Sequence, residues 1–232
     1  MSALQRLGIS VETIEKEQSK YSRAQEQTSD IFGFKWSKRN TYESEAVNKN
    51  AERWLNERYC DNNPNKLQEW LSGGRKIILD AGCGAAYSAL LFFKDHLNQH
   101  DYLGVDISDA VKIAQQRFTE SGYPGDFLQI SLMDLPIPEA SVDLIFSEGV
   151  LHHTDNTEDS IKYLAGKLKK GGRFLFYVYA KKAVIREFTD DHIRESLLSM
   201  GDEDAWKTLE SLTKLGIALG ELNIDIDVPD DI

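Results

Sequence analysis

The chain has 232 residues, of which 41% are hydrophobic and 28% charged, a composition typical of a soluble globular protein. With 27 Lys and Arg against 38 Asp and Glu, the net charge is −11, so no nucleic-acid partner is expected. The longest apolar run, 89–93, is far shorter than a membrane span, and the chain begins without the apolar segment of a signal peptide. The two cysteines, Cys60 and Cys83, have no C-x-x-C or zinc-ligand spacing. We therefore expect a cytoplasmic protein with no membrane span, no disulfide and no metal site.

The first 72 residues are mostly polar, and helical patterns appear only from Ala46 onward. Residues 31–36 interrupt the polar sequence with three aromatic side chains. Apolar residues then recur at helical spacing from Ala46 to Tyr59, and a second short helix is predicted over 66–71. The aromatic cluster has two interpretations, a lid over a ligand or a hydrophobic staple onto the core. We expect 1–72 to form an N-terminal helical arm or lid.

From residue 73 the pattern changes to short apolar strands that alternate with amphipathic helices. Helices are predicted over 88–97, 109–120 and 158–169, the last with a basic end before Gly171 that matches the rules for a helix C-terminus. Alternation of this kind favours an α/β fold with a doubly wound, mainly parallel sheet, over 73–180. The rest of the chain, 181–232, is predicted to be helical, with one strand-like run at 222–228. Strands are predicted over 76–80, 102–106, 127–130, 142–147 and 173–179.

Glycines and acids follow the first three predicted strands. Gly82 and Gly84 come directly after the first strand, where glycine lets the backbone approach a ligand closely. Asp106 ends the second strand, where a carboxylate can accept hydrogen bonds from a ribose diol, and Asp134 follows the third. Each acid has the alternative of capping the next helix or turn. Because carboxyl ends of parallel strands share one sheet edge, three such features predict a ligand site there.

The segment 70–180 resembles the class I S-adenosylmethionine-dependent methyltransferases. The order and spacing of five motifs carry the resemblance: Leu-Asp-Ala-Gly-Cys-Gly at 79–84, Gly-Val-Asp-Ile-Ser at 104–108, Met-Asp at 133–134, Ser-Glu-Gly-Val-Leu-His-His at 147–153 and Leu-Lys-Lys-Gly-Gly-Arg-Phe at 168–174. The resemblance implies a Rossmann-like fold and S-adenosylmethionine as cofactor, released as S-adenosylhomocysteine. A nicotinamide enzyme fits less well, because the sixth position of its G-x-G-x-x-G fingerprint is Tyr87 here.

The resemblance also implies roles for individual residues. Asp106 would bind the ribose hydroxyls, Ile107 would pack on the adenine, and Asp134 would accept from the adenine amino group. Further cofactor-binding residues would hold the methionine moiety (Asp80, Gly82 and Gly84, with Cys83 in the same loop), flank the adenine (Met133) and line the methyl-transfer site (Ser147 and Glu148).

The residue types after the fourth strand suggest a general base. His152 and His153 are candidates, because imidazole titrates near neutral pH, and each has the alternative of a local structural hydrogen bond. Glu148 is a rival candidate, or it orients the amino group of the cofactor. A base is required only where the acceptor is protonated at the working pH.

Two departures from the family pattern bear on activity. Ala86 stands where the family carries a third glycine, and a left-handed backbone there would cost an alanine about 1 kcal/mol. The family sheet ends with two further strands, of which at most one is visible, so the C-terminal strand pair is expected to be incomplete. An open apolar sheet edge would favour a homodimer or a missing segment.

These features predict a cytoplasmic methyltransferase, of EC class 2.1.1, that acts on a small-molecule acceptor. The alternative is a cofactor-binding module that is inactive or needs a partner chain. The sequence identifies neither the acceptor nor the accepting atom.

Overall fold

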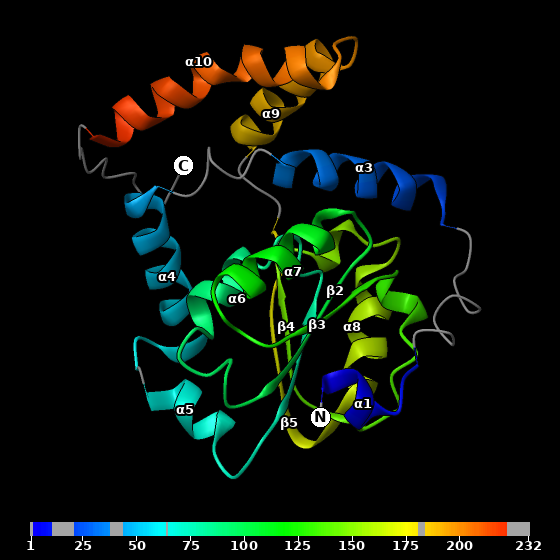
Figure 1. Cartoon of the computed structure of the whole chain (residues 1–232). Coiled ribbons are helices and arrows are strands. Elements are labelled where there is room, and N and C mark those ends of the chain that lie inside the picture. The colour runs from blue at the N-terminus through cyan, green and yellow to red at the C-terminus, as the bar shows by residue number, and fades with distance from the viewer. Residues whose placement is uncertain (1, 11–20, 38–43, 64, 181–183, 222–232) are drawn as a thin grey trace. The chain divides into compact units, whose positions relative to one another are not determined.

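The computed structural model describes residues 2–10, 21–37, 44–63, 65–180 and 184–221 (Figure 1). It divides into two compact units, Met1–Tyr179 and Ala180–Ile232. No described helix is long and apolar enough to cross a membrane. The strand-like run predicted at 222–228 lies outside the described residues.

The first unit is built on a parallel sheet of five strands in the order β3-β2-β1-β4-β5. The order reverses direction between β1 and β4, so the chain runs outward on both sides of this point, as in a doubly wound fold. The predicted α/β class and parallel sheet are confirmed. The strands are β1 (Ile77–Ala81), β2 (Asp101–Asp106), β3 (Asp126–Gln129), β4 (Val142–Glu148) and β5 (Leu168–Tyr177).

Side chains of the strands alternate between two hydrophobic cores, one on each face of the sheet. Ile78 packs in the core with α4 (Glu45–Cys60), α5 (Asn65–Leu71), α6 (Tyr87–Phe92) and α7 (Ala110–Glu120). Ile77 and Leu79 point to the opposite core, with α1 (Ala3–Leu7) and α8 (Thr157–Lys167). The continuous burial of β1 and β2 follows from this covering of both faces.

The described N-terminal helices cover 3–7, 23–37, 45–60 and 65–71, and the third and fourth match the predicted patterns. The helix α3 (Arg23–Ser37) contains the aromatic cluster and packs against α7 near the carboxyl ends of the strands. Two short 3-10 helices, η2 (Leu132–Asp134) and η3 (Leu151–His153), follow β3 and β4 at the same edge.

The boundary between α8 and β5 differs from the prediction. The helix ends at Lys167, and β5 begins at Leu168 instead of at 173. A shift in register opposite Asp143 accommodates residues 169–172, and Lys169 binds the Asp143 carboxylate at 2.8 Å. Gly171 was predicted to end the helix. It lies instead within this irregular part of β5, where its φ is 81°. The predicted helix 88–97 is also shorter, since α6 ends at Phe92 and turns continue to residue 99.

The second unit is described over α9 (Val184–Leu197) and α10 (Asp202–Glu221), as the helical prediction for this segment anticipates. Large apolar side chains of this unit are exposed to solvent, among them Leu198, Leu212, Leu215 and Ile217.

Candidate functional site

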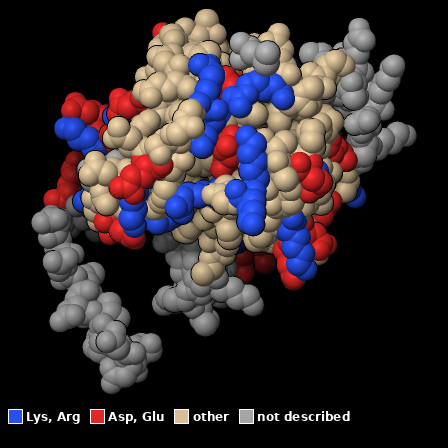
Figure 2. Space-filling model, turned by 90° about the horizontal axis from the view of Figure 1, so that it is seen from below, with Lys and Arg blue, Asp and Glu red and all other residues tan. Residues whose placement is uncertain are grey.

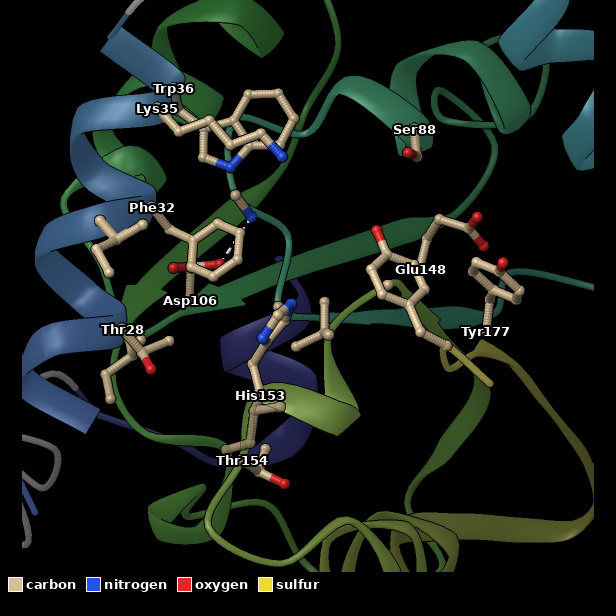
Figure 3. A pocket seen from close by; sticks show the side chains of 18 of the residues that line it. Thr28, Phe32, Lys35, Trp36, Ser88, Asp106, Glu148, His153, Thr154 and Tyr177 are labelled. Carbon is tan, nitrogen blue, oxygen red and sulfur yellow. Dashed lines mark hydrogen bonds between the residues drawn. The ribbon is translucent and has the colours of Figure 1, made fainter. Parts of the chain in front are cut away.

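A cavity of about 700 Å³ opens at the carboxyl ends of β1, β2, β4 and β5 (Figure 3). Its volume is in the range of about 300–1,000 Å³ that small-molecule sites occupy. The motif loops line one side of it. The N-terminal helices line the other, with Gln25, Thr28, Ile31, Phe32, Lys35 and Trp36 from α3 and with Ala51, Trp54, Leu55 and Arg58 from α4.

The glycine loop after β1 forms part of the cavity wall. Gly82 has a φ of 86°, and a Cβ atom there would lie 2.3 Å from Cγ1 of Val150. Gly84 has a φ of 49°, and its Cβ atom would lie 2.6 Å from Nε1 of Trp36. Both positions therefore require glycine for two reasons, the backbone conformation and the close approach of a neighbouring side chain. At both residues the backbone itself faces the cavity.

Asp106 joins this loop to the end of β2. Its Oδ2 atom accepts a hydrogen bond from the Gly84 N–H at 2.8 Å, and its Oδ1 atom accepts from the N–H and hydroxyl of Ser108 at 2.8 and 2.6 Å. Burial raises the pKa of Asp106, and the hydrogen bonds from Ser108 and Gly84 oppose that rise. An ionised carboxylate has about four acceptor positions, so these three bonds leave room for one more.

Three predicted cofactor residues lie behind the wall instead of lining it. Asp80 is buried and accepts a hydrogen bond from the Tyr102 hydroxyl, and burial raises its pKa to about 7. Ser147 is fully buried, and its hydroxyl donates to the Ala81 carbonyl oxygen at 2.8 Å, which links β4 to β1. Cys83 is buried within the loop, where burial raises the pKa of its thiol.

The residues predicted to contact the adenine lie along one edge of the cavity. Ile107 and Met133 line it, and Met133 is 38% exposed. The Ile107 carbonyl oxygen accepts from the Ser29 hydroxyl of α3 at 3.2 Å, so α3 is fastened to this edge. Asp134, at the end of η2, is half-buried beside the lining residues.

Glu148 is held by two residues of α4 that the sequence interpretation did not select. Its two carboxylate oxygens contact Arg58 and the hydroxyl of Tyr59. The Arg58 guanidinium also lies 3.8 Å from the centre of the Tyr177 ring. A signal was present in the sequence, because Arg58 follows Trp54 by four residues and so lies on the same helix face.

The two histidines after β4 occupy different environments. His153 lines the cavity, and the ring of Phe32 contacts it edge-on with the centroids 5.0 Å apart. His152 stacks behind it, 4.0 Å from the His153 ring and 4.1 Å from Tyr179, and is not among the lining residues. Neither ring nitrogen of His152 has a hydrogen-bond partner among the described residues.

The protonation state of His153 follows from its surroundings. Burial lowers its pKa, and the neighbouring His152 and the Lys35 ammonium lower it further. The pKa of His153 is thereby lowered to about 4, so the imidazole is neutral at pH 7 and is a weak base.

The core of the chain matches a known family. Residues 79–176 match the family model described as a methyltransferase domain. The core therefore has the sequence of a methyltransferase domain.

Relatives of the methyltransferase domain are similar over part of their length. An uncharacterized protein of Synechococcus sp. is 37% identical over 123 residues, which cover 50% of this chain and 29% of that protein. An uncharacterized methyltransferase of Bacillus subtilis, YcgJ, is 29% identical over 150 residues, 60% of this chain and 56% of the relative. Further relatives are tRNA U34 carboxymethyltransferases, 29–35% identical over 103–107 residues. The chain thus spans 29% of the length of the first of these relatives and 56% of the length of the second.

The methyltransferase fold is also found in solved structures. The geranyl diphosphate C-methyltransferase of Streptomyces coelicolor A3(2) superposes with a TM-score of 0.51 at 16% identity, covering 75% of this chain and 73% of that one. At this identity the likeness concerns the fold alone.

The residues around the cavity fit S-adenosylmethionine. Gly82 and Gly84 line the cavity and contribute backbone atoms but no side chain of their own to its wall. Asp106 keeps one acceptor position for a ribose hydroxyl, and the apolar Ile107 and Met133 flank the place for a planar base. The donor and acceptor chemistry of the methyltransferase domain therefore suits the cofactor.

Proposed function

We propose that this chain transfers the methyl group of S-adenosylmethionine to a small-molecule acceptor bound in the same cavity. The observation that carries this proposal is the composition of the cavity wall. Gly82, Gly84 and Asp106 form one side, and the aromatic faces of α3 and α4 form the other, around one space of about 700 Å³. A cavity bounded in this way suits a small acceptor better than a folded RNA, and the net charge of −11 also disfavours RNA.

On the cofactor side, several residues position the ligand. We assign the ribose contact to Asp106 and the adenine contacts to Ile107 and Met133. Asp134 accepts from the adenine amino group in this proposal, and the glycine loop holds the methionine moiety. Asp80, Cys83 and Ser147 support the loop and the strand ends from behind, as their burial and hydrogen bonds suggest.

When bound, the cofactor supplies an electrophilic methyl group on a sulfonium. The chain contributes alignment and exclusion of water, because charge is reduced as a sulfonium reacts with an anionic nucleophile. Phe32, Trp36 and Trp54 provide an apolar wall around the reacting groups. Where the acceptor arrives protonated, we assign the role of proton acceptor to His153, because its ring lines the cavity; its lowered pKa makes it a weak base, which favours an acidic acceptor.

The roles of the other two candidate bases are different. His152 packs against the His153 ring and does not line the cavity. We therefore assign it the role of holding the His153 ring in position. Glu148 is engaged by Arg58 and Tyr59, so it orients the helix α4 and the amino end of the cofactor.

Calorimetric titration with S-adenosylhomocysteine tests the proposal. We expect micromolar binding by the whole chain, and a loss of roughly 5–150-fold in Asp106→Ala, the equivalent of about 1–3 kcal/mol for unmade hydrogen bonds. Because Asp106 also holds the glycine loop, Met133→Ala is the second variant, with Met200→Ala in the second unit as its matched control. Binding that is absent in the folded wild type would refute the proposal.

A turnover assay then separates the enzyme from the inactive module. Methylated product, detected by mass spectrometry across a panel of acceptors, establishes activity. Tight binding without product in any acceptor class, also after mixing with a cell extract, would favour the module.

A further inference from the structure

Large apolar side chains of the first unit gather at the cavity although water reaches them. Ile31 of α3 is 54% exposed, Trp54 of α4 is 57% exposed and Tyr179 after β5 is 56% exposed, and all three line the cavity. Of the large apolar side chains that are markedly exposed in the described part of this unit, only Val47 and Phe176 do not line it. Exposure of apolar surface to water is unfavourable, so its concentration at one place indicates a ligand that covers it.

Aromatic rings make up much of this part of the wall. Figure 3 shows the rings of Phe32 and Tyr177 on opposite sides of the cavity. A flat apolar ligand gains area burial and ring-to-ring contacts in such a place, whereas a sugar or an aliphatic amine would lose the hydration of its polar groups there. The rings come from three parts of the chain: Phe32 and Trp36 from α3, Trp54 from α4, and Tyr177 and Tyr179 from the end of β5 and the residues after it.

Neighbouring groups hold two of these rings in position before a ligand enters. The Arg58 guanidinium lies 3.8 Å from the centre of the Tyr177 ring, and Glu148 in turn binds Arg58. His152, which does not line the cavity, packs on Tyr179 with the ring centroids 4.1 Å apart. Rings that are already ordered lose little conformational entropy when a ligand binds, so more of the contact energy appears as affinity.

The aromatic part of the wall and the glycine loop border the same space. Gly82 and Gly84 line the cavity together with the rings. Trp36 connects the two parts, because a Cβ atom at Gly84 would come within 2.6 Å of its Nε1 atom. A molecule that covers the rings therefore lies next to the place proposed for the cofactor. This position argues for the methyl acceptor as the occupant.

We propose that the methyl acceptor is a flat, apolar molecule with an aromatic ring system, bound between the side chains of α3, α4 and the end of β5. This inference rests on the proposed function. Among the lining rings Trp54 is the most exposed, so it has the most surface to remove from water when a ring system binds.

Binding of simple probes to the chain saturated with S-adenosylhomocysteine tests this inference without turnover. The probes are 2-naphthol, its saturated counterpart decahydro-2-naphthol and the polar sugar glucose, and the readout is titration followed by ligand NMR. We expect 2-naphthol to bind roughly 2–10-fold more tightly than decahydro-2-naphthol, because only the flat ring system gains aromatic contacts. Glucose should bind more weakly than either.

Substitutions at Trp54 connect this binding to the proposed site. Trp54→Ala should weaken the binding of 2-naphthol roughly tenfold or more, and Trp54→Phe, which keeps a ring, should retain most of it. Leu215→Ala in the second unit is the matched control, because Leu215 is 55% exposed and is not among the lining residues. Circular dichroism checks that each variant is folded.

The outcomes separate the two proposals. If S-adenosylhomocysteine itself does not bind, the proposed function fails, and the acceptor inference fails with it. If it binds but neither apolar probe binds more tightly than glucose, the inference alone is wrong, and a protein segment is the better explanation of the apolar wall. Equal binding of 2-naphthol by the wild type and by folded Trp54→Ala would also overturn it. Equal binding of the two apolar probes would refute the requirement for an aromatic ring system.

Discussion

Substitution of Gly82 by alanine should destabilise the methyltransferase domain more than an ordinary glycine substitution does. An alanine at a φ of 86° is strained by about 1–2 kcal/mol. Its Cβ atom would also lie 2.3 and 2.5 Å from the two γ carbons of Val150, and overpacking of this kind costs about 1–3 kcal/mol. Alanine also lowers the conformational entropy of the unfolded chain relative to glycine, and this stabilises the folded state by about 0.4–1 kcal/mol. The expected net loss is about 1–5 kcal/mol in the free energy of unfolding.

Gly122 offers a matched control for the backbone contribution. Its φ is 72°, close to that of Gly82, but no atom lies within 4 Å of the position of its Cβ. Gly122→Ala should therefore lose only about 1 kcal/mol. Urea denaturation followed by far-ultraviolet circular dichroism measures both values, and the difference between them isolates the contact with Val150.

Removal of the γ carbons of Val150 should relieve part of the clash. In the Val150→Ala background the cost of Gly82→Ala should fall by about 1 kcal/mol, and not to the level of Gly122→Ala, because the Val150 Cβ remains 2.8 Å away. Equal losses in Gly82→Ala and Gly122→Ala would show that the loop moves away freely. That result would refute the rigid, close-packed glycine loop on which the cofactor site is built.

Three further predictions concern the same edge of the sheet. Burial raises the pKa of Asp80 from 3.8 to about 7, so the folded state binds a proton more tightly, and stability should fall as pH rises from about 4 to 7, by up to about 4 kcal/mol. Asp80→Asn should remove this fall in urea titrations, and the comparison of the two proteins cancels the opposite contribution of His153, whose pKa is lowered. Arg58→Gln and Glu148→Gln should each lower the free energy of unfolding by about 1–2 kcal/mol. A double-mutant cycle should give a coupling energy of about 1 kcal/mol between the two residues, and additive losses would mean that the ion pair contributes nothing. Ala86→Gly should leave thermal stability and S-adenosylhomocysteine affinity nearly unchanged, because relief of its φ of 56° is offset by a lost buried methyl group; a tenfold gain in affinity would contradict this.

The departure at Ala86 illustrates what a motif comparison can and cannot predict. The sequence indicated that a left-handed backbone would strain this alanine, and its φ of 56° confirms that conformation. Ala86 is nevertheless fully buried in the core below α6 and does not line the cavity. The strain is therefore balanced by packing of its methyl group, which spacing in the sequence does not reveal.

The strand ends could be predicted because parallel topology determines where they lie. Once 77–81 and 101–106 are recognised as successive parallel strands, the loop at Gly82 and the carboxylate of Asp106 must share one edge of the sheet. The hydrogen bond between Gly84 and Asp106 follows from this arrangement. The start of β5 was predicted less well, because basic residues followed by Gly171 fit a helix end and an irregular strand equally.

The contacts of the N-terminal helices could not be predicted in the same way. Arg58 meets Glu148 across 90 residues of sequence, and Trp36 meets the loop at Gly84, because α3 and α4 pack against α7 and α6. No local pattern encodes such pairs, since helix spacing indicates which residues share a face and not what that face contacts.

The two halves of the site consequently have different physical constraints. Gly82 and Asp106 belong to the close-packed sheet edge, where a change disturbs the loop and the fold together. Lys35 and Trp54 project from helix surfaces into the cavity, where a change alters the charge and shape of the wall and leaves the strands in place. Substitutions of Lys35 and Trp54 should therefore change acceptor preference at little cost in stability, while the cofactor half tolerates few changes.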